Sequence, residues 1–189
     1  MKKNAVFGLL VVSMLLIGKG SWIHAKAMLA QYLIAQSWEQ QQHGAQRVKP
    51  WSWADTWPVA RLKAPALGID QFVLAGASGR VLAFGPGHVN GTAIPGEEGN
   101  IVISGHRDTH FRWLKDLDDG DIIELDLPNG KAQQYVVKQR QVISEQDQWV
   151  LSDQSASVLN LLTCYPFDAI IPGGSQRYLV TAEPRAGDI

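Results

Sequence analysis

The chain has 189 residues, of which 46% are hydrophobic, and this length supports one well-buried domain with an appendage rather than two full domains. Lys and Arg number 17 against 18 Asp and Glu, with no long run of either sign, so the charge pattern argues against a nucleic-acid partner. The single cysteine excludes an internal disulfide, a thiolate zinc cluster and a Cys-x-x-Cys redox pair.

The first predicted element is an apolar helix at the amino end. The stretch 5–17 alone covers about 20 Å of a hydrocarbon layer about 30 Å thick. A helix that continues through Ile23 reaches about 28 Å and places Trp22 at an interface where tryptophan is favoured. We therefore expect residues 1–26 to be an uncleaved membrane anchor. A removable signal peptide stays open as the alternative, because Ala25-Lys26-Ala27 resembles a cleavage site.

Residues 27–56 are expected to form a helical stalk and linker. The helical pattern continues from Met28, and its apolar stripe consists of Leu29, Tyr32 and Leu33. A Gln-rich polar stretch follows at 39–50 and reads as a frayed helix end or a linker. The tryptophans Trp51, Trp53 and Trp57 come next, and such residues either cover a core or touch a membrane surface.

Residues 57–189 have the pattern of a mainly β domain, in which turn residues recur between short apolar or alternating runs. The expected strands are 59–62, 72–74, 101–104, 122–127, 135–143, 158–163 and 178–182. Helical pattern is limited to 80–84, 111–117 and a turn near 153–157. Asn129-Gly130 predicts a hairpin in which both residues supply positive φ angles. We expect a closed or nearly closed antiparallel β-barrel with short connecting helices.

Two of the expected strands end at chemically reactive side chains. The run 101–103 leads to His106, and the run 158–163 leads to Cys164. If the cysteine strand and the strand that begins at Arg177 are antiparallel neighbours, Cys164 and Arg177 meet beneath the connection between them. Taken singly, a lone cysteine packs as a small hydrophobe and a lone arginine faces water. The functional interpretation therefore depends on these residues converging.

Metal sites are weakly indicated. His106 and His110 are four residues apart, as in helical zinc sites, but Gly105 and the turn-like stretch 107–109 argue against a helix there. A group of acidic residues resembles a solvated turn rather than a calcium site, and consists of Asp116, Asp118, Asp119 and Asp121. We expect neither a metal nor a cofactor.

Three stretches of the sequence, in this order, resemble the motifs of sortases, the membrane-anchored cysteine transpeptidases. They are PGEEGNIVISGHRDTHFRWL at 95–114, LLTCYPF at 161–167 and QRYLV at 176–180. The resemblance covers roughly 57–183 and implies a sortase-type barrel. Asn160 replaces the leading Thr of the Thr-Leu-x-Thr-Cys pattern of many sortases, which leaves the cysteine untouched. The short anchor and the stretch 105–111 are most similar to sortases of Gram-negative proteobacteria.

The resemblance implies a reaction as well as a fold. Cys164 would attack a carbonyl in a C-terminal Leu-Pro-x-Thr-Gly-like (LPXTG-like) sorting signal of a target protein, and the thioacyl enzyme would be transferred to an amine acceptor in the cell envelope. His106 would protonate the leaving amine and activate the incoming one, and Arg177 would stabilise the oxyanion. Leu162 and Thr163 are candidate peptide-lining residues.

The residues after His106 have two possible roles. Asp108 and Thr109 either orient His106 or cap the helix expected at 111–117. A single N-terminal anchor in the inner membrane would leave the catalytic domain on the periplasmic side.

Two other functions compete with the sortase interpretation. A peptidoglycan-directed cysteine transpeptidase is disfavoured, because no histidine lies within 50 residues upstream of Cys164. The main alternative is a non-enzymatic envelope barrel that binds a partner peptide by strand addition, with Cys164 structural.

Overall fold

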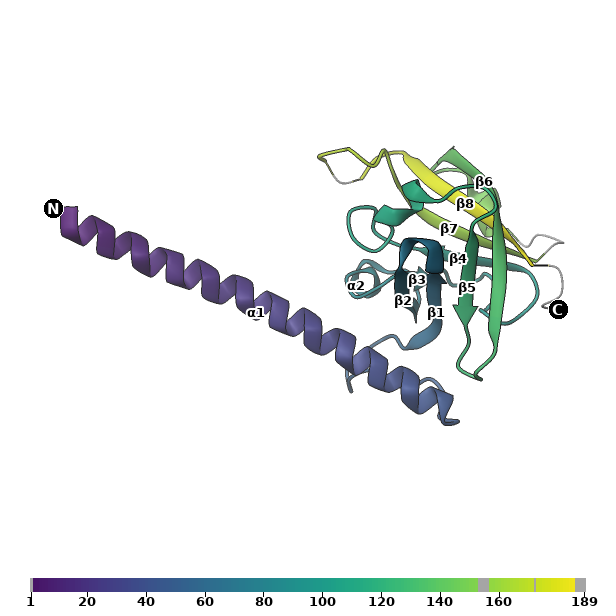
Figure 1. The fold of residues 1–189 in the computed structure, drawn as a ribbon, viewed down its shortest axis with the longest axis horizontal. Coiled ribbons are helices and arrows are strands. Elements are labelled where there is room, and N and C mark those ends of the chain that lie inside the picture. The colour runs from purple at the N-terminus through teal and green to yellow at the C-terminus, as the bar shows by residue number, and fades with distance from the viewer. Residues whose placement is uncertain (1, 153–156, 172, 186–189) are drawn as a thin grey trace.

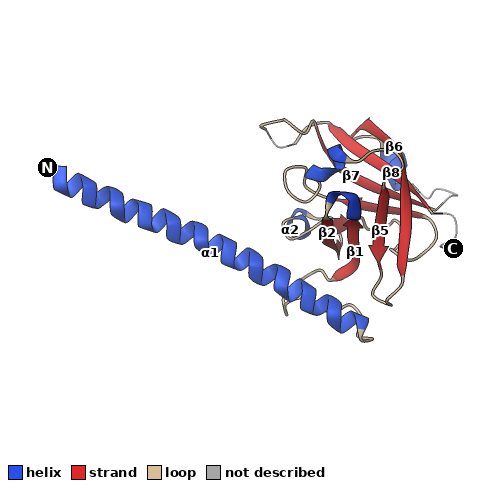
Figure 2. Cartoon of the chain, viewed as in Figure 1, coloured by secondary structure: helices blue, strands red, loops and turns tan. Residues whose placement is uncertain are grey.

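The computed structural model describes residues 2–152, 157–171 and 173–185, which form one long helix and a closed β-barrel (Figure 1). The long helix is α1 (Lys2–Gln42). The strands are β1 (Pro58–Ala64), β2 (Ile69–Ala75), β3 (Gly87–His88), β4 (Asn100–Ser104), β5 (Ile122–Asp126), β6 (Ala132–Ser144), β7 (Val158–Tyr165) and β8 (Gln176–Pro184). The short helices are η1 (Pro65–Leu67), α2 (Gly79–Leu82), η2 (Arg112–Asp116) and η3 (Gln148–Leu151). Figure 2 shows that the short helices lie in the connections between strands.

The strands close in the order β1-β2-β3-β4-β7-β8-β6-β5, so the predicted barrel is confirmed. The sheet is antiparallel except at two positions, where β2 pairs with β3 and β4 pairs with β7 in parallel. Strand β3 was not expected, because two residues are too short to produce an alternating pattern. The turn predicted near 153–157 lies almost wholly outside the described residues.

The hairpin between β5 and β6 forms where it was predicted, but its turn geometry differs. Gly130 has a φ of 80°, and it is the only one of the two expected residues with a positive value. The Asn129 side-chain oxygen instead accepts a hydrogen bond from the Lys131 backbone nitrogen at 3.0 Å. Asn129 therefore stabilises the turn through its side chain rather than through a left-handed backbone.

The barrel interior is filled by alternate residues of the strands. In β1 the buried positions follow a strict period of two, so Ala60 and Leu62 face inward. Strand β4 is buried on both faces: Ile101 and Ile103 belong to the interior, whereas Val102 packs with Val150 of η3 on the outside. This double burial explains the uninterrupted apolar run in the sequence.

Helix α1 packs its C-terminal half against the barrel. The buried residues Ala30, Ile34 and Trp38 lie four apart on one face, and the Trp38 ring is 6.0 Å from that of Phe72. The expected stripe was wrong: Leu29 and Tyr32 are 56% and 59% exposed. The error arose because the helix presents small as well as large residues to the barrel.

The N-terminal half of α1 projects away from the barrel (Figure 1). The helix is long and apolar enough to cross a membrane, and its most apolar stretch is not buried against the protein. It continues without a break across residues 26 and 27, which were expected to separate the anchor from the stalk.

Candidate active site

The segment that bears His106 lies beside the strand that bears Cys164, because β4 and β7 are parallel neighbours. Ser104 pairs with Leu162, and one residue further the Gly105 backbone nitrogen donates to the Leu162 carbonyl oxygen at 3.1 Å. Parallel strands bring their carboxyl ends to the same edge of a sheet. His106, which follows β4, is therefore beside the end of the strand that carries Cys164.

The cysteine and arginine strands are antiparallel neighbours, as the sequence predicted. Cys164 lies directly opposite Arg177 in the register of β7 and β8. Residues opposite each other in an antiparallel pair project from the same face of the sheet. The fold thus brings together the imidazole-bearing segment, the thiol and the arginine at one edge of the barrel.

Alternation along β7 separates the two residues proposed to line a peptide groove. Leu162 is on the same outer face as Cys164 and packs against the cluster that contains Leu179. Thr163 faces inward, is 2% exposed, and its hydroxyl donates to the Gly105 carbonyl oxygen at 2.7 Å. Thr163 therefore ties the cysteine strand to the segment that precedes His106.

Cys164 itself is a free thiol of intermediate burial. A cysteine with only a packing role would be expected to lie fully within the apolar interior, where Leu159 and Leu161 of the same strand lie. Cys164 instead follows Thr163 at the end of β7, where the side chains become partly exposed. A peptide at this edge could reach the sulfur.

The Arg177 guanidinium is held by three acceptors. It donates to the carbonyl oxygens of Gly174 and Gln176, and it forms an ion pair with Glu145 at 2.9 Å. The Arg177 and Glu145 side chains are 24% and 47% exposed, so water screens this pair. These bonds use Nη1 twice and Nη2 once; within the described part of the chain, Nε–H is not engaged.

A second arginine, Arg107, was missed as a site residue. Its side chain is 5% exposed and donates from Nη1 to the Pro166 carbonyl oxygen at 2.6 Å and from Nη2 to that of Ala169 at 2.9 Å. These bonds connect the β7–β8 connection to the segment that follows β4 and bears His106. The hydrogen bond that Arg107 donates to Asp108 is the main cause that raises the pKa of the Arg107 guanidinium, and Cys164 raises this pKa further electrostatically.

A signal for Arg107 was present in the sequence. The connection after β7 contains several prolines and glycines and cannot pair its carbonyl groups as a strand does. A long donor from a neighbouring strand end could satisfy those groups, and Arg107 is the first such residue after β4. Read alone, however, it looks like an ordinary turn residue.

Asp108 and Thr109 are next to His106 but do not cap a helix. Both Asp108 carboxylate oxygens accept from Arg107, at 2.8 and 3.0 Å, and this pairing lowers the pKa of the Asp108 carboxyl. The Thr109 and Phe111 backbone nitrogens donate to the His106 carbonyl oxygen. Helix η2 begins after Phe111 without a side-chain cap, so the capping alternative is wrong.

Other residues considered as metal ligands in the sequence have structural surroundings instead. Burial, with a smaller effect of His106, lowers the pKa of the His110 imidazole. Asp118 and Asp119 both form ion pairs with Arg140. Among the described residues, no group of three or more His, Cys, Asp or Glu side chains is arranged to hold a metal ion.

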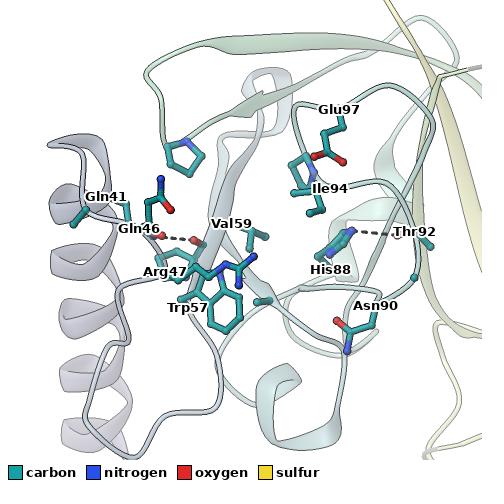
Figure 3. Close-up of a pocket in the computed structure, with 16 residues that line it drawn as sticks. Gln41, Gln46, Arg47, Trp57, Val59, His88, Asn90, Thr92, Ile94 and Glu97 are labelled. Atoms are coloured by element: carbon teal, nitrogen blue, oxygen red, sulfur yellow. Dashed lines mark hydrogen bonds between the residues drawn. The ribbon is translucent and has the colours of Figure 1, made fainter.

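A pocket of about 730 Å³ lies apart from this edge, between the end of α1 and the β3–β4 connection (Figure 3). Gln41 and Arg47 line one side of it, and Ile94 and Glu97 the other. His88 belongs to β3 and lines this pocket. Its Nε2 is 2.9 Å from the Ala93 carbonyl oxygen, and burial lowers the pKa of its imidazole.

Comparison with known proteins finds similarity to sortases. A family model described as the sortase domain matches residues 62–185. Sortase D of Bacillus subtilis (strain 168) is 32% identical over 119 residues, which are 63% of this chain and 60% of that protein. The match thus spans less than two thirds of the length of this curated relative.

Two solved structures share the fold. The Clostridium perfringens Sortase D5 transpeptidase is 29% identical with a TM-score of 0.61, over 69% of this chain and 80% of that chain. The Clostridium perfringens sortase C, solved with the C-terminal cell wall sorting motif, is 22% identical with a TM-score of 0.62, over 85% and 90%. The second likeness concerns the fold alone.

Proposed function

The chain belongs to the sortase family, and from this premise we propose that it is a cysteine transpeptidase that cleaves a sorting signal in a target protein. The observation that carries the proposal is the strand register. It sets Cys164 opposite Arg177 and beside the segment that bears His106. These are the three residue types that the reaction requires.

The reaction begins at the thiolate of Cys164. The sulfur attacks the carbonyl carbon of the scissile peptide bond, and the carbonyl oxygen becomes an oxyanion in the tetrahedral intermediate. Arg177 donates to this oxyanion through the Nε–H that its other contacts leave available, while Glu145 and the Gly174 carbonyl hold the guanidinium in place.

His106 completes the transfer. The imidazolium donates its proton to the leaving amine, the C–N bond breaks, and the acyl group stays on sulfur as a thioester. The neutral imidazole then removes a proton from an incoming amine, which attacks the thioester and releases Cys164. The product is a new amide, and the enzyme regains its starting protonation state.

Three further residues have different relations to this site. Leu162 is on the face of Cys164 and is the proposed contact for the bound peptide. Thr163 acts through the backbone of Gly105, because its hydroxyl faces the interior. Asp108 is bonded to Arg107, so any orienting effect of Asp108 on His106 is electrostatic.

Family membership and α1 support a proposed substrate and location. We propose a target protein with a C-terminal LPXTG-like signal and an amine acceptor in the cell envelope. Helix α1 anchors the chain in the inner membrane, and the barrel lies on the periplasmic side. The proteobacterial class rests on the likeness of residues 105–111, whereas the relatives described above are from Bacillus and Clostridium.

The experiment is capture of the thioacyl enzyme. The purified full-length chain is incubated with a library of Leu-Pro-x-Thr-Gly-type peptides and analysed by intact-protein mass spectrometry. We expect an adduct on Cys164 that is absent in Cys164→Ala and disappears when a primary amine is added. Non-covalent peptide binding without any adduct would instead establish the envelope peptide-binding barrel.

A further inference from the structure

The barrel is docked onto α1 very near the end of its apolar stretch. From residue 6 onward, Ala30 is the first buried residue of α1, and it is eight residues beyond Trp22. Eight residues of helix rise about 12 Å. If Trp22 is at the membrane interface, as the proposed anchoring requires, the barrel begins within reach of the lipid headgroups.

A groove opens at this level between α1 and the barrel. It has a volume of about 630 Å³ and is lined by Lys26 and Leu29 of α1, Trp53 of the linker, and Arg80 and Phe84 near α2. Lys26 is only four residues beyond Trp22, which is about 6 Å along the helix. Trp53, on the same groove, is 83% exposed.

A second apolar feature lies next to the active site. Ile170 and Ile171 are 97% and 78% exposed, and with Trp53 they are the most exposed large apolar side chains of the described barrel and linker. They belong to the β7–β8 connection, which leaves the barrel on the side where the N-terminal half of α1 projects (Figure 1). Arg107 holds the preceding residue, Ala169, in place.

We propose that the groove beside α1 and the exposed part of the β7–β8 connection together bind the surface of the phospholipid bilayer in which α1 is anchored. The lipid-facing surface consists of Lys26, Trp53, Arg80, Ile170 and Ile171. Tryptophan is favoured at the interface, cationic side chains attract lipid phosphates, and aliphatic side chains enter the acyl boundary. Each residue type on this surface therefore has a matching layer of the bilayer.

The consequence concerns substrate choice. Cys164 is six residues before Ile170 in the same strand and connection, so the thiol would be held within about 20 Å of the lipid boundary. An enzyme held in this way acts best on a sorting signal that is itself close to the membrane. A freely soluble peptide gains nothing from this arrangement, since it reaches the site from solution.

The first test measures lipid contact and does not depend on catalysis. The full-length chain with Cys164→Ser is given a single new thiol, Ile170→Cys or Trp53→Cys, labelled with an environment-sensitive fluorophore and reconstituted in liposomes of phosphatidylcholine and phosphatidylglycerol. The matched control is Ile94→Cys. Ile94 is also exposed, but it lines the pocket beside Gln41, which is 19 residues, or about 28 Å, beyond Trp22.

We expect spin-labelled lipids to quench the labels at residues 53 and 170 several-fold more than the label at residue 94. Equal, weak quenching at all three positions would overturn the inference. Because the Cys164→Ser chain is inactive by design, this result stands whether or not the proposed reaction is correct.

The second test separates lipid contact from peptide contact. The double variant Ile170→Asp, Ile171→Asp is compared with the unmodified chain on a soluble sorting peptide and on the same signal in a membrane-anchored substrate. We expect a several-fold loss only with the anchored substrate. An equal loss with both substrates would show that the connection binds the peptide rather than the bilayer, and would contradict the proposal.

Discussion

Two segments flank Cys164, and the barrel holds them in different ways. The histidine segment, residues 104–111, is fixed by buried groups. Phe111 at its end is fully buried, Arg107 in its middle is 5% exposed, and the Gly105 carbonyl oxygen accepts from Thr163 inside the barrel. Moving this segment would break several buried contacts at once.

In the arginine segment, residues 174–177, the backbone of residues 176–177 pairs with β6 and β7, but the Arg177 side chain is held by contacts that face water. Its main side-chain contact is the ion pair between Arg177 and Glu145, and Gly174 and Gln176 supply backbone carbonyls. Exposed ion pairs contribute about 0 to 1 kcal/mol to stability. The side-chain contacts of Arg177 can therefore be lost with little effect on the stability of the fold.

The histidine and arginine segments serve two different requirements of the proposed reaction. A proton donor must point at the leaving amine in every cycle, which favours a rigid mount for His106. An oxyanion donor must be held near the position where negative charge develops, and the contacts of Arg177 with Glu145 and Gly174 hold it without burying it fully. Variants of the two segments should accordingly separate stability from activity.

The largest expected effect is that of Arg177→Ala on activity. Removal of one oxyanion donor costs about 100-fold to 1,000-fold in rate in other enzymes. The stability change should stay below about 1 kcal/mol, because the lost ion pair is exposed. Rates of thioacyl formation and urea unfolding of the same preparation give both quantities.

The matched control for this variant is Arg61→Ala. Arg61 forms an ion pair of comparable exposure with Asp70, on strands away from Cys164. We expect a similar small change in stability and no change in rate. A rate equal to that of the unmodified chain in Arg177→Ala would remove the guanidinium from the mechanism.

The next effect is that of Gly105→Ala, which tests the rigid segment. A Cβ atom at Gly105 would lie 2.7 Å from the nearest atom of the Phe111 ring, and Phe111 is fully buried and cannot move aside freely. Overpacking of this kind costs about 1 to 3 kcal/mol. We expect a lower free energy of unfolding, measured by urea denaturation, together with slower acylation.

Gly174→Ala is the corresponding change in the arginine segment. A Cβ atom there would meet only the Tyr165 carbonyl oxygen, at 3.4 Å, which is close to an ordinary contact. This variant should keep both stability and activity. If the two glycine variants behave alike, the two segments do not differ in rigidity and the comparison fails.

Much of this arrangement could be predicted from the sequence, and what was missed has physical causes. The strands around Cys164 and Arg177 were placed because apolar runs bounded by turn residues are local signals. The parallel pairing of β4 with β7 depends on contacts between residues nearly 60 positions apart, as between Ser104 and Leu162, and no local pattern encodes it. The convergence of His106 with Cys164 was therefore inferred only from resemblance.

Side-chain roles were harder to predict than strand positions. Arg107 looked like a turn residue because its acceptors, at Pro166 and Ala169, belong to a distant connection. Glu145 gave no signal, since its partnership with Arg177 exists only once β6 and β8 pair. Thr163 was a candidate for the groove because the resemblance places the peptide beside the strand of Cys164, although alternation places adjacent residues of that strand on opposite faces.

A smaller effect is expected from Glu145→Gln, which loosens the arginine segment without removing its donor. Glutamine keeps the shape of the side chain but not its charge, so Arg177 loses an anchor worth about 0.2 to 1 kcal/mol. Acylation should slow by roughly two-fold to five-fold, and added salt should slow the unmodified chain in the same direction. Asp70→Asn, in the matched pair with Arg61, should leave the rate unchanged. Faster acylation by Glu145→Gln would mean that Glu145 restrains Arg177 rather than orients it.

The smallest effect is a pH dependence of the rigid segment. Burial, with a smaller effect of His106, lowers the pKa of His110 below its ordinary value of 6.5. As the pH falls below that value the unfolded chain binds the proton first, so the free energy of unfolding should decline between about pH 7.5 and about pH 5.5. His110→Gln should remove part of this decline, and His88→Gln another part, because burial lowers the pKa of His88 as well. Hydrogen exchange resolves the location: once the intrinsic pH dependence of amide exchange is divided out, acid should lower the protection of residues 104–111 more than that of residues 174–177, and His110→Gln should abolish that difference. An equal loss of protection in both segments at low pH would show that the histidine segment is not held by the burial of His110.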